Sequence, residues 1–161
     1  MAESVKAEIA LTGTSQNLMR NTAVSFDNLG ENYFKLGEKE KGLAMLQKNL
    51  EISRLLAASD DKNLEAQIDV SNAYVTFANA YEKFGDYPKA IESAKNVLQI
   101  LEKTYTSDNK NGEVSNGIVL RTRQLAGLLE KTNQANEAKV YRTKAAEMCK
   151  LEINASSCTN N

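Results

Sequence analysis

A repeat spaced at 48 residues constrains this chain more than any other feature of its sequence. The pentapeptide SDDKN begins at Ser59, and the near copy SDNKN begins at Ser107. When the sequence is aligned with itself at this offset, large residues form one column, namely Tyr33, Tyr81 and Leu129. Small residues form another, namely Gly42, Ala90 and Ala138. A large residue followed nine positions later by Gly or Ala suits two helices in a tight hairpin, because the small residue lets the two backbones approach closely.

Apolar residues inside each repeat recur at separations of three, four and seven, which is the period of an amphipathic helix. No stretch sustains the alternation typical of a strand, so we expect an all-α protein built from helix–turn–helix units. The first helices are expected over residues 16–36, 64–84 and 113–132, and the second helices over residues 39–58, 87–105 and 135–153.

The turns inside these units carry their own signals. Gly37, Gly85 and Asn133 stand where a helix ends with a residue in the left-handed conformation, which glycine tolerates best and asparagine next best. Pro88 falls in the first turn of a following helix, where its missing N–H is not needed. The two copies of the pentapeptide then link one unit to the next, and their Ser, Asp and Asn residues end one helix and cap another.

The repeat divides the chain into segments. Residues 1–14 are interpreted as an N-terminal cap or the end of a truncated repeat, since residues 1–12 align with 49–60. Three repeats follow, over residues 15–62, 63–110 and 111–153, and residues 154–161 form a polar tail. The third repeat is degenerate, with Thr122 and Thr132 in columns that hold aromatic residues or Leu elsewhere, and it is expected to be a solvent-facing cap.

Charge and composition exclude several functions. Lys and Arg number 20 against 21 Asp and Glu, so no excess of positive charge favours binding to nucleic acid or to an anionic membrane. The chain has no histidine, the commonest general base, and no phosphate-binding loop or nucleophile motif. We therefore expect no enzyme, no cofactor and no membrane span, and a cytoplasmic location.

Metal sites are also disfavoured. With two cysteines and no histidine, a zinc site would need carboxylates to complete it. SDNKNGE resembles a calcium loop, but Ser107 stands at the first ligand position and Ile118 at the twelfth, where carboxylates are required. Cys149 and Cys158 are expected to be reduced thiols, although a disulfide that pins the tail is the alternative in an oxidising compartment.

The repeat columns resemble the tetratricopeptide repeat. In the first repeat they are Phe26, Leu29, Gly30, Tyr33, Gly42, Leu46 and Asn49; in the second Tyr74, Phe77, Ala78, Tyr81, the FGDY turn and Ala90; in the third Leu125, Ala126, Leu129 and Ala138. The period exceeds the usual value of about 34 residues. Longer repeats of this kind are similar to those of kinesin light chains and of tetratricopeptide regions in large bacterial signalling proteins, including kinases.

This resemblance implies a right-handed α-solenoid whose first helices line a concave groove. Transferred by motif column, the groove-facing residues are Val24, Asp27, Glu31, Phe34, Asn72, Val75, Asn79, Glu82, Leu120, Arg123 and Glu130, with Gly127 in the same column set. Asn79 stands where family members often hold a peptide backbone. The carboxylate clamp of chaperone-binding members is missing, because Asp27 and Glu31 occupy its columns.

The function expected from this resemblance is a non-catalytic protein-interaction module that binds a peptide or helix of a protein partner in the groove. Phe34 and Val75, as apolar side chains on that face, favour a bound peptide over a merely hydrated surface, whereas Tyr74 and Tyr81 are expected in the core. Two alternatives remain open: a regulatory or scaffolding segment of a larger signalling protein, and a scaffold that self-associates through its solenoid ends.

Overall fold

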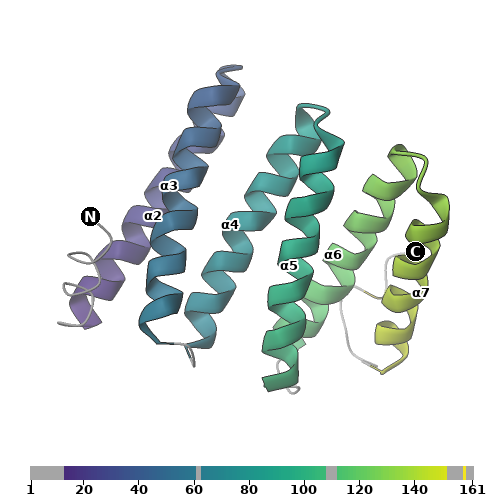
Figure 1. The fold of residues 1–161 in the computed structure, drawn as a ribbon. Coiled ribbons are helices and arrows are strands. Elements are labelled where there is room, and N and C mark those ends of the chain that lie inside the picture. The colour runs from purple at the N-terminus through teal and green to yellow at the C-terminus, as the bar shows by residue number, and fades with distance from the viewer. Residues whose placement is uncertain (1–12, 61–62, 108–111, 152–157, 159–161) are drawn as a thin grey trace. The chain divides into compact units, whose positions relative to one another are not determined.

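The computed structural model describes residues 13–60, 63–107, 112–151 and 158. In these residues, all secondary-structure elements longer than one residue are α-helices (Figure 1). The prediction of an all-α protein is therefore confirmed. The six described helices are α2 (Gly13–Lys35), α3 (Lys39–Ser59), α4 (Leu64–Lys83), α5 (Tyr87–Ser107), α6 (Gly112–Lys131) and α7 (Ala135–Leu151). Their bounds lie within three residues of the expected ranges.

The chain forms two compact units, Met1–Ala80 and Tyr81–Asn161, and the division falls near the end of α4. In the first unit α2 and α3 pack against each other as an antiparallel hairpin (Figure 1). In the second unit α6 packs against both α5 and α7. Within each unit, these consecutive helix pairs pack closely, an arrangement compatible with a helical repeat.

The turns inside the three repeats share one geometry. Gly37, Gly85 and Asn133 have φ angles of 77°, 74° and 59°, so the predicted left-handed residues are confirmed. In the second turn the amide of Asp86 donates to the Tyr81 carbonyl at 2.9 Å, and the amide of Gly85 donates to the Glu82 carbonyl at 3.0 Å. These two bonds satisfy carbonyls that the ending helix leaves unpaired.

Residue Asn63 caps the helix that opens the second repeat. Its side-chain oxygen accepts a hydrogen bond from the amide of Ala66 at 3.1 Å. One backbone N–H in the first turn of α4, which has no partner within the helix, is thereby satisfied. This contact agrees with the expectation that the polar link preceding α4 supplies its cap.

The small-residue columns are buried in all three repeats. Gly30, Ala78 and Ala126 form one column, and Gly42, Ala90 and Ala138 form the other. A Cβ atom at Gly30 would lie 2.9 Å from Cδ2 of Leu46 and 3.1 Å from the Gly42 carbonyl oxygen. The hairpin of α2 and α3 is therefore packed too closely to admit a side chain at this crossing.

One expectation about burial is wrong. Phe34, expected on an exposed groove face, is 7% exposed because its ring packs over Gly42. Leu29 is 41% exposed, although Phe77 and Leu125 in its repeat column are buried. Thr122 in the third repeat is fully buried, and its hydroxyl lacks a hydrogen-bond partner among the described atoms.

A disulfide joins Cys149 in α7 to Cys158, so the expectation of two reduced thiols is also wrong. The two Cα atoms lie 5.5 Å apart, which is within the range that a disulfide requires. No helix in the described part of the chain is long and apolar enough to cross a membrane.

Candidate functional site

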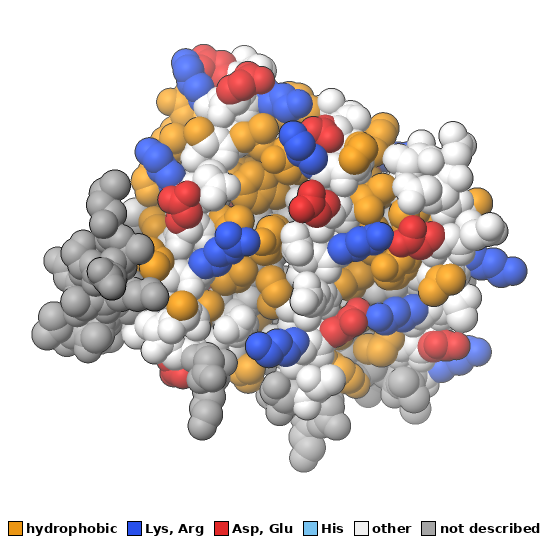
Figure 2. All heavy atoms as spheres, in the orientation of Figure 1, with side chains coloured by type: hydrophobic (Ala, Val, Ile, Leu, Met, Phe, Trp, Pro, Cys, Tyr) orange, Lys and Arg blue, Asp and Glu red, His pale blue; other side chains and the backbone are white. Residues whose placement is uncertain are grey.

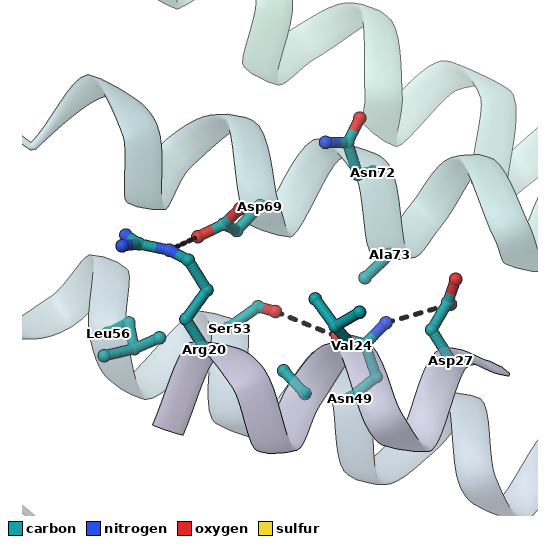
Figure 3. A pocket seen from close by; sticks show the side chains of 10 residues that line it. Arg20, Val24, Asp27, Asn49, Ser53, Leu56, Asp69, Asn72 and Ala73 are labelled. Carbon is teal, nitrogen blue, oxygen red and sulfur yellow. Dashed lines mark hydrogen bonds and ion pairs between the residues drawn. The ribbon is translucent and has the colours of Figure 1, made fainter. Parts of the chain in front are cut away.

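A cleft in the first unit lies between α2, α3 and α4 (Figure 3). Its volume is about 220 Å³. The lining residues are Arg20, Ala23, Val24 and Asp27 from α2, Asn49, Ser53 and Leu56 from α3, and Asp69, Asn72 and Ala73 from α4. Their spacings of one, three and four residues place each set on one face of its helix.

The floor of the cleft is a short polar chain. Ser53 Oγ donates a hydrogen bond to Asn49 Oδ1 at 3.1 Å, and Asn49 Nδ2 donates to Asp27 Oδ1 at 3.0 Å. Ser53 and Asn49 are buried, so these bonds replace water for groups that would otherwise be left unpaired. The chain of bonds holds the Asp27 carboxylate at the side of the cleft.

One wall of the cleft carries an ion pair between α2 and α4. Arg20 Nε lies 2.7 Å from Asp69 Oδ2, and Arg20 Nη1 lies 3.2 Å from Glu65 Oε1. The hydrogen bond to Asp69 is the main reason that the pKa of Arg20 is raised above its ordinary value. Both carboxylates therefore engage the positive charge of Arg20.

Asp27 has a different environment. Burial raises its pKa above the ordinary value of an aspartate, and the nearby carboxylate of Glu31 acts in the same direction. Hydrogen bonds from Asn49 and Thr76 oppose this shift but do not cancel it. The ionised form of Asp27 is destabilised by burial, and a positive group in the cleft would stabilise it.

The structure brings together only part of the predicted binding set. Val24, Asp27 and Asn72 line the cleft, whereas Glu31 and Asn79 are exposed elsewhere in the first unit, Val75 is half-buried and Phe34 is buried. The other predicted residues belong to the second unit. Leu120 is exposed there, and Arg123 is half-buried with Nη2 at 3.9 Å from Cys149 Sγ.

Two predicted groove residues of the second unit take part in ion pairs. Glu82 Oε1 lies 2.7 Å from Lys131 Nζ. Glu130 accepts two hydrogen bonds from the guanidinium of Arg142, each of 2.7 Å, and hydrogen bonding to Arg142 lowers the pKa of the Glu130 carboxyl. Ligand binding at either glutamate would have to compete with these contacts.

The sequence reasoning missed Arg20, Asp69, Asn49 and Ser53. Arg20 lies four residues before Val24 and Asp69 three residues before Asn72, so extending the groove face by one helical turn would have found both. Asn49 and Ser53 interrupt the apolar face of α3 between Leu46 and Leu56. Polar residues at buried helix positions require partners, and this was the available signal.

Neither the models of known protein families nor the curated proteins contain a match to this chain. Among the described residues, no group of three or more Cys, Asp or Glu side chains is placed to hold a metal ion. On the face drawn in Figure 2, basic and acidic side chains are interspersed among apolar ones, and neither sign dominates that face.

Proposed function

We propose that this chain is a non-catalytic protein-interaction module. Its helical pairs are tetratricopeptide-like repeats wound into a right-handed solenoid, and the first helices present a groove that binds an extended peptide or a helix of a partner protein. The 48-residue repeat, the shared turn geometry and the buried small-residue columns support this assignment.

The observation that carries the proposal is the position of the cleft. Val24 and Asp27 come from the first helix of one repeat and Asn72 from the first helix of the next, and all three line one cavity. Groove-binding repeats combine side chains of successive first helices in this way. The lining mixes apolar carbon with amide and carboxylate groups, as is usual where a peptide is held by a few polar contacts.

A selection from a random library of 12-residue displayed peptides tests this function. The native chain is expected to enrich peptides whose binding is lost with Asn72→Ala, because Asn72 lines the cleft and is exposed. Gln99→Ala is the matched control, since it removes another exposed carboxamide from a helix in the second unit. Peptides that bind both variants equally, or the absence of enrichment, would refute binding in this groove.

A second candidate function, self-association, is favoured by the outer face of α2. Leu18 and Leu29 are 67% and 41% exposed, and their spacing of 11 residues places them on one side of α2. Leu36, which is 73% exposed, lies in the turn that follows the helix. The residues 48 positions after Leu18 and Leu29 are Ala66 and Phe77, and both are buried. In the second repeat this face is therefore covered, whereas in α2 it is open and could receive a second copy of the chain.

The mass in solution, measured over a range of protein concentrations, tests self-association. The native chain is expected to form dimers that Leu29→Glu dissociates, because a charge would be buried in the contact. Val140→Glu, at another exposed apolar position, is the control and should leave the dimer intact. A monomer at every concentration would refute this candidate.

A further inference from the structure

The cleft between α2, α3 and α4 is too small for a cofactor. Its volume of about 220 Å³ lies below the range of roughly 300–1,000 Å³ that is usual for sites of drug-sized molecules. A space of this size suits one inserted side chain. The question is therefore which side chain the lining would select.

The cleft has polar residues at its two ends and apolar residues between them. Val24 and Ala73 lie between Asp27 at one end and Arg20 at the other (Figure 3). An inserted side chain would thus meet apolar carbon along its length and a polar group at its tip. Lysine and arginine have this form, with an aliphatic stem and a charged head.

The charge of the lining favours a positive head. Arg20 is engaged by Asp69 and Glu65, so the two carboxylates outnumber the one cation at that end. At the other end, the described groups that act on Asp27 are Asn49, Thr76 and Glu31, and none of them is positively charged. A half-buried carboxylate without a cation is a group that a ligand can stabilise by supplying one.

We propose that the cleft is a specificity pocket for a basic side chain, so that the partner peptide inserts a lysine or arginine with its stem on Val24 and Ala73 and its charge at Asp27. This inference rests on the proposed function, because it names the chemistry of a ligand in the same groove. Asp27 then sets specificity, and the exposed residues nearby add contacts without selecting the charge.

The test uses peptides that the native chain selects from the random 12-residue library and that lose binding with Asn72→Ala. These peptides are expected to share a Lys or Arg at one position. In synthetic copies, replacing that residue by norleucine keeps the stem and removes the charge, and it should weaken binding to the native chain about tenfold. This arm requires no protein variant, so it does not depend on whether a variant folds.

A double-mutant cycle then locates the charge. With Asp27→Asn, whose fold is checked by circular dichroism, the norleucine replacement should change affinity by less than about twofold. Glu31→Gln is the control, because it removes a neighbouring exposed carboxylate outside the lining and should retain the full effect.

The possible failures are distinguishable. Groove-dependent peptides that lack a shared basic residue would overturn the pocket while leaving the proposed function intact. The same holds if the norleucine replacement weakens binding equally to the native chain and to Asp27→Asn. If the library yields no peptide that depends on Asn72, groove binding itself fails and the pocket fails with it.

Discussion

The ring of Phe34 occupies the space in which a side chain at Gly42 would lie. This contact joins α2 to α3, and it explains why an apolar residue in a predicted groove column is buried instead of exposed. In the same column the later repeats have Glu82 and Glu130, which form ion pairs with Lys131 and Arg142. One column thus has a packing role in the first hairpin and an electrostatic role in the others.

The Gly42→Ala substitution is expected to lower the free energy of unfolding by about 1–3 kcal/mol, because the added methyl group overlaps the Phe34 ring in a close-packed crossing. Chemical denaturation monitored by circular dichroism measures the change. Gly127→Ala is the matched control. A Cβ at Gly127 meets no atom within 4 Å, so the same substitution there should raise stability by about 0.5–1 kcal/mol. Equal effects at the two glycines would contradict the packing argument.

The turn at Gly85 gives a second prediction. Gly85 has a φ angle of 74°, a conformation that L-residues adopt at a free-energy cost of about 1–2 kcal/mol. We expect Gly85→Ala to destabilise the protein by about this amount, and Gly85→Asn to destabilise it less, as Asn133 occupies the equivalent turn. Thermal unfolding of the two variants compares them directly. A Gly85→Ala variant as stable as the native chain would mean that the turn changes conformation.

Removal of the Cys149–Cys158 disulfide should reduce stability by at most about 2–3 kcal/mol, because the two residues are only nine positions apart and close a short loop. The comparison is between the native chain and a variant with both Cys149→Ser and Cys158→Ser, each with and without a reducing agent. The reducing agent should destabilise the native chain and leave the variant unchanged. Since disulfides are rare in the cytosol, recovery of the oxidised protein from its native cells would argue against the expected cytoplasmic location.

The raised pKa of Asp27 gives a prediction about pH. Because of burial, the Asp27 carboxyl binds its proton more tightly in the folded protein than in the unfolded chain. The ionised carboxylate therefore opposes folding at neutral pH. As pH falls towards the raised pKa, protonation removes this penalty. Asp27→Asn should therefore be more stable than the native chain at about pH 7, with a smaller difference at about pH 4.

Denaturant unfolding of both proteins at the two pH values measures this difference. Glu31, Asp69 and Glu65 are further carboxylates near the cleft, but they are present in both proteins, so the comparison isolates Asp27. A variant less stable than the native chain at neutral pH would show that the hydrogen bonds from Asn49 and Thr76 outweigh the effect of burial.

Much of the local structure follows from short-range chemistry that is legible in the sequence. The period of apolar residues predicts the helices, and Gly37, Gly85 and Asn133 predict where they end, because few residues tolerate a positive φ angle. The columns of Gly30 and Gly42 and their equivalents predict close helix crossings, since only small residues permit them. These features depend on neighbours within one or two turns, or on a hairpin partner nearby.

The tertiary structure alone decided which faces are covered. Leu29 and Phe77 share a repeat column, yet one is exposed and the other buried, because burial depends on which helices lie against a face and not on the residue itself. The ion pair of Arg20 with Asp69 and the bond between Asn49 and Asp27 likewise join residues that are 49 and 22 positions apart. Periodicity places a side chain on a face of its own helix, whereas the packing of several helices determines whether that face becomes a core, a surface or a cleft.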